Sequence, residues 1–429
     1  MRDFARSESP AVQEQLDRLG RLSVPDGRLG LDTIRALLER LGNPHHRLPP
    51  VFHVAGTNGK GSTCAFLHAM LEAQGYKVHV TTSPHLVRYN ERIRVAGKLI
   101  EDERLAELLA QVLDAGEDLN PSFFEVTIAA AFTEFARVPA DACVVEVGLG
   151  GRFDATNVIE RPAACGIAAL GIDHERFLLA PEAGTPEQPL ARIAFEKAGI
   201  AKQGRPLVTL HYPDEAAEEI ERIASDCGAI LAVRGRDWTS DSLGNILHYS
   251  DPSGEVHLPV PSLVGAHQAE NAALAVAMLR HQSLVRISEE AIVTGLRTAH
   301  WPARLQRLHA GPLTEEHEVW LDGGHNRSAG DALAQHFEGQ RLHLVIGMLK
   351  GKDPASIIRP LKANLASVTA VPVPDHDYHP AKAFGRGTQA AASVPEALAA
   401  IPVGRVPVLV AGSLYLAGEV LRLNGEFPD

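Results

Sequence analysis

A glycine-rich turn that carries a lysine follows a short apolar run near the start of the chain. The run Val51–Ala55 predicts a buried strand, and residues 56–63 (GTNGKGST) follow it before a helical pattern begins. Glycines let backbone N–H groups approach an anion, and the helix N-terminus adds partial positive charge. The lysine can reach terminal phosphates, and a hydroxyl can hold Mg²⁺. The order of strand, turn and helix therefore predicts a nucleotide-phosphate site, although Gly61 stands between Lys60 and Ser62, where the usual phosphate loop has no residue.

Three further apolar runs predict strands, and each carries polar side chains at or just after its carboxyl end. Ligands bind at the carboxyl ends of strands in open α/β sheets, so these side chains should meet near the phosphate turn. Each alone is as readily structural, for example a capping serine or an ion-paired glutamate. Together Ser83, Glu146 and His174 offer hard oxygen and imidazole ligands for Mg²⁺. The runs and their polar residues are 77–82 with Ser83, 142–147 with Glu146, and 163–170 with Asp173 and His174.

The composition is typical of a globular protein and argues against some classes of function. A chain of 429 residues exceeds one ordinary domain, so two are expected. The net charge of -12 argues against general binding to nucleic acid or anionic membranes. No apolar stretch reaches the roughly 20 residues of a membrane span, and the N-terminus lacks the apolar core of a secretory signal, so we expect a cytoplasmic protein. The widely spaced cysteines favour buried thiols over disulfides or a zinc site: Cys64, Cys143, Cys165 and Cys227.

Strand-like and helical patterns alternate through most of the chain, which predicts a mostly parallel sheet covered on both faces. Asp237–Pro261 differs, because its short segments broken by Gly, Asp, Ser and Pro predict a small antiparallel excursion. Trp301-Pro302 ends a helical pattern, since proline disfavours its continuation. After this point the α/β alternation restarts. We therefore predict a first domain at 1–298, a linker at 299–303 and a second domain at 304–429.

A series of motifs in order resembles the folylpolyglutamate synthase/dihydrofolate synthase family, within the Mur-ligase-like ATP-dependent amide ligases. The likeness covers roughly residues 20–420. It implies a P-loop ATPase domain of the Mur-ligase central-domain type, followed by a smaller Rossmann-like α/β domain. The stretches TSPHLVRYNERIRV and EVGLGGRFDATN discriminate best between this family and its Mur relatives. The motifs are AGTNGKGST, TTSPHLVRYNERIRV, SFFE, EVGLGGRFDATN, GIDHE, FEKAGI, GAHQAENAALA, PARLQ, LDGGHN, GMLKGKD and VLVAGSLY.

The resemblance implies roles for the matching positions, which we state as expectations. The ATP-binding set is Asn58, Gly59, Lys60, Gly61, Ser62, Thr63, Asn271, Arg304 and Asp322. The Mg²⁺ ligands are Ser83, Glu146 and His174. The catalytic residues are Lys60, Lys197 and His325, and Lys197 matches a family lysine that is carbamylated. The pteroate- or folate-binding set is Arg28, Gly30, Ser122, Phe123, Phe124, Glu125, Arg152, Phe153, Asp154 and Ala155.

The activity that the resemblance implies is ATP-dependent ligation of L-glutamate to dihydropteroate and to the glutamate tail of tetrahydrofolates. The acceptor carboxylate would be activated as an acyl phosphate, which closure of the second domain would shield from water. We expect a monomer with no nucleic-acid or membrane partner. Two departures from the family pattern are residues 175–179 (ERFLL) with the longer loop 180–189, and Gly324 in place of alanine before His325.

Three alternatives stay open at this point. The enzyme could extend glutamate tails without making dihydrofolate. It could be a Mur-type ligase for a cell-wall precursor, although the phosphate turn begins at Gly56 and leaves little room for a domain that binds a UDP-sugar. It could also be a nucleotide switch or transport ATPase, a class against which the second α/β domain and the Asp322/His325 motif argue.

Overall fold

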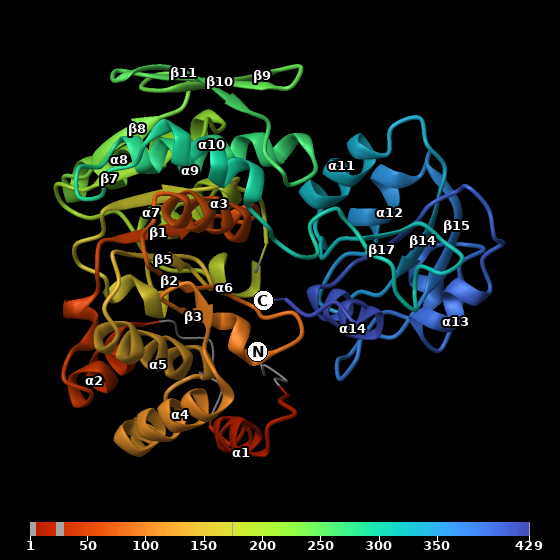
Figure 1. Ribbon diagram of the computed structural model, residues 1–429, viewed down its shortest axis with the longest axis horizontal. Coiled ribbons are helices and arrows are strands. Elements are labelled where there is room, and N and C mark those ends of the chain that lie inside the picture. The colour runs from red at the N-terminus through yellow and green to blue at the C-terminus, as the bar shows by residue number, and fades with distance from the viewer. Residues whose placement is uncertain (1–5, 23–29, 174, 429) are drawn as a thin grey trace. The chain divides into compact units, whose positions relative to one another are not determined.

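The computed structural model describes residues 6–22, 30–173 and 175–428, and the chain separates into two compact units (Figure 1). The first unit comprises Met1–Pro84, Tyr89–Ser262 and Gln268–His300. The second comprises His85–Arg88, Leu263–His267 and Trp301–Asp429. The main segment of the second unit thus begins at the Trp301-Pro302 pair. Two short segments from earlier in the chain also belong to this unit, so one boundary at 299–303 does not separate the two units completely.

In the described part of the chain, the centre of the first unit is an eight-stranded sheet with the order β4-β3-β2-β5-β1-β6-β7-β8. Six strands that are consecutive in this order, β2-β5-β1-β6-β7-β8, pair in parallel. Strands β3 and β4 pair antiparallel and form one edge of the sheet. All residues of β1 and β5 are buried, as expected for a parallel sheet covered on both faces. The strands are β1 (Val51–Ala55), β2 (Val78–Thr81), β3 (Ile93–Val95), β4 (Lys98–Leu99), β5 (Ala142–Glu146), β6 (Ala164–Ile167), β7 (Pro206–Thr209) and β8 (Ile230–Val233).

Helices cover both faces of this sheet (Figure 1). Helix α3 packs on one face together with α10, and α4 and α5 lie on the other over a core of leucine, valine, alanine and phenylalanine side chains. The helices are α1 (Pro10–Leu19), α2 (Asp32–Arg40), α3 (Lys60–Ala73), α4 (Asp102–Gly116), α5 (Phe123–Arg137), α6 (Glu175–Leu178), α7 (Pro189–Ala198), α8 (Asp214–Cys227), α9 (Ala266–Arg280) and α10 (Glu289–Thr298). Cys64, Cys143 and Cys165 are buried and all four cysteines are free thiols, as the sequence predicts.

A separate three-stranded antiparallel sheet follows β8, with the order β11-β10-β9. Its strands are β9 (Thr239–Leu243), β10 (Ile246–Asp251) and β11 (Gly254–Pro259). This sheet is the antiparallel excursion predicted for Asp237–Pro261.

The second unit contains a six-stranded sheet with the order β12-β13-β17-β14-β15-β16, described here within residues 301–428. Only β12 runs antiparallel to its neighbour, and alternating residues of β13, β14 and β17 fill two cores, one on each face. The strands are β12 (Gln306–Arg307), β13 (Val319–Leu321), β14 (Leu342–Ile346), β15 (Leu365–Ala370), β16 (Gln389–Ala390) and β17 (Val408–Ala411). The helices are α11 (Arg327–His336), α12 (Ala355–Leu361), α13 (Val394–Ala399) and α14 (Leu414–Asn424).

Two α/β units built on mostly parallel sheets confirm the predicted fold class. Within the described ranges, no helix is both long and apolar enough to cross a membrane.

Candidate active site

The phosphate turn links the central strand β1 to helix α3. Gly59 caps the helix in the left-handed region, with φ of 83°, a conformation that glycine adopts without strain. A Cβ atom on Gly59 would also collide with the side-chain oxygen of Asn271. The amide of Asn271, which lies buried on α9, therefore sits directly beside the turn. Because α3 begins at Lys60, its unsatisfied N–H groups face this turn, as an anion site requires.

Two lysines share one backbone carbonyl in the turn. The Nζ atom of Lys60 donates to the carbonyl oxygen of Gly56 at 3.1 Å, and the Nζ atom of Lys197 donates to the same oxygen at 2.8 Å. Burial, and after it the charge of Lys60, lower the pKa of Lys197 to about 7, whereas the charge of Asp173 acts in the opposite direction. A large share of the Lys197 amine is therefore neutral near neutral pH, and a neutral amine is nucleophilic.

Close packing between helix α7 and the loop after β5 sets the position of Lys197. A Cβ atom on Gly151 would lie 2.7 Å from the carbonyl oxygen of Glu196, and one on Gly199 would lie 2.5 Å from the Cβ of Arg152. The N–H of Arg152 donates to the same Glu196 carbonyl at 2.7 Å. Glycine is therefore needed at both positions for this approach.

Arg152, a predicted substrate-binding residue, lies in an ion cluster that holds the same loop against α7. Its guanidinium contacts Glu196 at 2.9 Å and Glu182 at 2.5 Å, and Arg192 contacts the same two carboxylates. Hydrogen bonds from Arg152 and Arg192 lower the pKa of Glu182 to about 2. Arg152 also stacks on Phe153, with its Cζ atom 4.0 Å from the ring centroid. The geometry gives Arg152 and Phe153 a structural role, and substrate binding by them stays a prediction.

Two of the predicted metal ligands, Ser83 and Glu146, lie at the same edge of the sheet as the phosphate turn. Strand β5 pairs with β1 on one side and β2 on the other, so Glu146 at the end of β5 and Ser83 after β2 are neighbours. The N–H of Ser83 donates to the Glu146 carboxylate at 3.1 Å. Glu146 is only 5% exposed, and burying a carboxylate is costly without a compensating charge. A buried carboxylate beside a serine hydroxyl offers oxygen ligands that fit a hard cation such as Mg²⁺. His174 lies outside the described residues.

The segment predicted to bind the pterin forms the start of α5. Ser122 and Glu125 form a capping box, in which the Ser122 hydroxyl accepts from the Glu125 N–H at 3.2 Å and the Glu125 carboxylate accepts from the Ser122 N–H at 2.7 Å. Phe123 and Phe124 are half-buried beside the core. The Phe124 ring lies against Gly148, where a Cβ atom would come within 2.5 Å of it. The helix cap therefore fixes two aromatic rings next to the loop after β5.

Asp154 organises that loop from inside. It is buried, and its carboxylate accepts hydrogen bonds from the Leu149 N–H at 2.8 Å and the Thr156 N–H at 3.0 Å. Burial raises the pKa of Asp154, against the effect of these hydrogen bonds. Ala155 follows it and is buried, while Gly30 is exposed and no described atom lies within 4 Å of a Cβ built there. Arg28 lies outside the described residues.

The predicted residues of the second unit lie in the turn after β13 and, for Arg304, in the segment before β12. The buried carboxylate of Asp322 accepts from the Leu305 N–H at 2.9 Å and the Gly324 N–H at 2.7 Å. Arg304 donates through Nη1 to the carbonyl of the preceding residue at 2.9 Å. The Nδ1 atom of His325 lies 3.2 Å from a carbonyl oxygen in the same turn. Asp322 thus joins the turn to the segment that carries Arg304, and contact of these residues with ATP stays a prediction.

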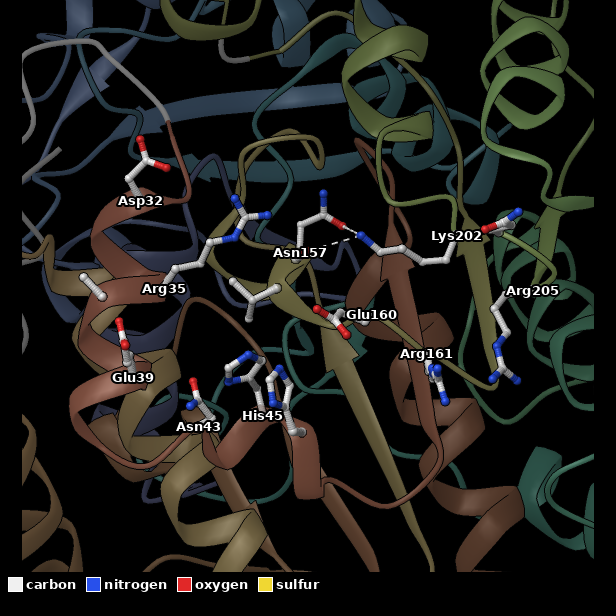
Figure 2. Close-up of a pocket in the computed structure, with 14 residues that line it drawn as sticks. Asp32, Arg35, Glu39, Asn43, His45, Asn157, Glu160, Arg161, Lys202 and Arg205 are labelled. Carbon is white, nitrogen blue, oxygen red and sulfur yellow. Dashed lines mark hydrogen bonds between the residues drawn. The ribbon is translucent and has the colours of Figure 1, made fainter.

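A cavity of about 850 Å³ lies at the other edge of the first unit's sheet (Figure 2). Its lining residues precede β1, β6 and β7, so they lie at the amino ends of strands whose carboxyl ends carry the phosphate turn. In this cavity the Nζ atom of Lys202 donates to the Asn157 side chain at 2.8 Å, and burial lowers the pKa of Lys202. The cavity is therefore not the nucleotide site.

Two groups beside Lys197 were not among the predicted site residues. Asp173 follows β6 and directly precedes His174; it is expected near the phosphate turn from its place after the strand, but it has no predicted role there. No sequence pattern indicates the shared carbonyl of Gly56, because every residue has a backbone carbonyl.

No family model matches the chain. The dihydrofolate synthase/folylpolyglutamate synthase of Bacillus subtilis is 37% identical over 358 residues, 78% of either chain. The dihydrofolate synthetase of Saccharomyces cerevisiae is 31% identical over 433 residues, 93% of this chain and 98% of the relative.

The solved structures that resemble this chain belong to the same kinds of enzyme as these relatives. Escherichia coli FolC in complex with DHPP and ADP has a TM-score of 0.85 and 31% identity, over 97% of either chain. A bifunctional folylpolyglutamate synthase/dihydrofolate synthase with Mn, AMPPNP and L-glutamate bound has a TM-score of 0.83 and 30% identity, over 98% of this chain and 99% of that one. The chain belongs to the dihydrofolate synthase/folylpolyglutamate synthase family.

Proposed function

We propose that this protein is an ATP-dependent ligase that joins L-glutamate to dihydropteroate and to the glutamate tail of tetrahydrofolates. The observation that carries the proposal is the gathering of the phosphate turn, Ser83, Glu146 and Lys197 at one edge of the sheet. The family membership supports the substrate class. Relatives have been solved with DHPP and ADP, and with Mn, AMPPNP and L-glutamate.

The chemistry explains why such a site is needed. A carboxylate does not react with an amine at neutral pH, because oxide would have to leave. Transfer of the γ-phosphoryl group of ATP to the carboxylate gives an acyl phosphate and ADP. The amine of glutamate then attacks the acyl carbon, phosphate leaves, and the amine loses a proton. Phosphoryl transfer depends mainly on charge neutralisation and positioning.

The residues at the sheet edge supply that charge. Lys60 and the N–H groups that begin α3 would neutralise the phosphates bound by residues 58–63, and Asn271 would close the turn from α9. Ser83 and Glu146, with His174, would hold a divalent metal, which when bound adds positive charge to the phosphate oxygens. The roles of Arg304, Asp322 and His325 at the nucleotide, and a monomeric cytoplasmic enzyme, remain part of this proposal.

We further propose that Lys197 carries a carbamate. Its neutral amine would add to CO₂, forming an N–C bond as one C=O π bond opens onto oxygen and releasing one proton, so that the neutral amine becomes an anion. The charge of Lys60 favours this change, because it repels an ammonium and attracts a carbamate, whereas the nearby carboxylates of Asp173, Asp154 and Glu196 act in the opposite direction. The carbamate N–H can still donate to the Gly56 carbonyl that the amine now contacts.

For the pteroate acceptor we propose that Phe124 contacts the pterin ring. Stacking suits a flat heterocycle, and the ring is half-buried at the loop after β5 rather than deep in the core. Ser122 and Glu125 would act by fixing the start of α5, and Asp154 by fixing the loop.

The test is an assay of purified protein with ATP and glutamate, resolved by product mass. One arm contains dihydropteroate, one tetrahydrofolate, one a muramyl peptide and one no acceptor. Glutamylated products in the first two arms support the proposal. A product with tetrahydrofolate alone limits the enzyme to tail extension, and a product only with the muramyl peptide overturns the assignment.

A further inference from the structure

The small sheet β9–β11 presents two histidines and a glutamate on one exposed face. Along β10 and β11 the residues alternate between a buried and an exposed side, and His248, Glu255 and His257 all belong to the exposed side. One nitrogen or oxygen atom from each of the three lies within 4.8 Å of the others. The rings of His248 and His257 meet edge to face with centroids 4.7 Å apart, and the Nε2 atom of His257 lies 3.5 Å from the Glu255 carboxylate.

Strand register explains why these side chains meet, and it places Asp241 in the same row. His248 is paired directly with His257 on β11 and with Asp241 on β9, so the three form a row across the sheet. Residues paired in this way have Cβ atoms about 4.5–5.5 Å apart. Glu255 precedes His257 by two residues and therefore projects from the same face. Two imidazoles and two carboxylates thus share one face of the sheet.

The opposite face of the sheet fixes the backbone that carries this row. Trp238 and Tyr249 stack with ring centroids 5.8 Å apart, and both are buried. Arg280 on α9 pairs with Asp251 at the end of β10 at 2.6 Å and lies over the Tyr249 ring. The strands are therefore held by the rest of the first unit, and only the exposed side chains would have to adjust to a ligand.

We propose that this face binds one divalent transition-metal ion of the zinc class, through His248, His257 and Glu255, with Asp241 or water as the fourth ligand. Imidazole and carboxylate together suit Zn²⁺ and its neighbours, whereas Mg²⁺ favours a shell of oxygen alone. Ligand atoms around a tetrahedral zinc lie about 3.3 Å apart. The exposed side chains would close the present spacing by rotation. The bound ion would link neighbouring strands of the sheet, independently of the ligase reaction.

The test is calorimetric titration of the full-length protein with Zn²⁺, with excess Mg²⁺ and ADP present to occupy the nucleotide site. We expect one zinc per chain, and an affinity at least about 10-fold lower in each of His248→Gln, His257→Gln and Glu255→Gln. The matched control is His309→Gln, because His309 is an exposed histidine 3.0 Å from the single carboxylate of Glu426. That control should bind zinc as the parent does.

Hydrogen exchange read by mass spectrometry locates the ion. Zinc should slow exchange in residues 239–259 of the parent and should not change the exchange of these residues in His257→Gln. Parent-like exchange of the variant without zinc would show that it is folded. Ligase turnover should be the same in the parent and in the three variants of the small sheet, His248→Gln, His257→Gln and Glu255→Gln. Parent-like zinc affinity in all three ligand variants, or zinc binding that is lost in Glu146→Gln instead, would overturn the proposal.

Discussion

Removal of CO₂ should inactivate the enzyme, because Lys197 is placed to form a carbamate. Its pKa of about 7, against an ordinary value of 10.5, leaves roughly three quarters of the amine neutral at pH 7.5, compared with about one part in a thousand for an exposed lysine. Carbamate formation consumes neutral amine and releases a proton, so the modified fraction should fall steeply as the pH drops below 7. At constant CO₂ pressure, turnover should follow that fraction.

The assay combines turnover with direct detection of the modification. Protein in ¹³C-labelled bicarbonate should show one carbamate signal that is absent in Lys197→Ala, and this variant should lose at least roughly 100-fold in turnover, about 3 kcal/mol. Short carboxylic acids should restore part of the activity by supplying the missing anion. The matched control is Lys202→Ala, since Lys202 also has a lowered pKa from burial but lies at the other end of the sheet. Full activity in CO₂-free buffer, with no carbamate signal, would refute the reasoning.

Four further results are expected. Lys60→Ala should leave the fold intact and lower turnover at least about 100-fold, since the variant lacks the charge that neutralises the phosphates; parent-like turnover would remove the phosphate assignment. Glu146→Gln should abolish most activity, with only partial recovery in added Mg²⁺, whereas a fully active but less stable variant would make Glu146 structural. Phe124→Ala should raise KM for dihydropteroate and leave KM for ATP nearly unchanged; equal changes would indicate general damage. Burial raises the pKa of Glu134, but hydrogen bonds from two arginines outweigh it and lower the pKa to about 2, so this carboxylate stabilises the fold above pH 4.5 and the contribution is lost as the pH falls toward 2. Chemical denaturation should show this loss in the parent and not in Glu134→Gln.

The arrangement of residues around the phosphate turn could largely be predicted, because it follows from local sequence pattern and from the geometry of a parallel sheet. Apolar runs in the sequence indicate β1, β2, β5 and β6. Because ligands bind at the carboxyl ends of strands in such sheets, Ser83 and Glu146 are expected beside the phosphate turn from their places along the sequence. Strand order then made them adjacent, with the Ser83 N–H on the Glu146 carboxylate.

Other features depend on contacts between segments far apart in the sequence. The short segment His85–Arg88 belongs to the second unit, where Leu86 and Val87 pack against its core, although the preceding residue belongs to the first. No pattern within four residues carries that information. Ser122 and Glu125 match the S-x-x-E capping signature, and the structure shows that they begin a helix, while their predicted place at the pterin site stays a prediction.

Lys197 shows how packing gives a residue its chemistry. On residue type alone it would be a surface lysine with an ordinary pKa. The glycines at 151 and 199 let α7 approach the loop after β5, which buries the amine and brings it to the carbonyl that Lys60 also contacts. Two ammonium groups on one carbonyl repel each other, so the site favours an arrangement in which one of them is neutral or replaced by an anion. In the proposed function a carbamate on Lys197 would replace one of these two cations by an anion, and a phosphate bound in the turn would supply negative charge beside the other.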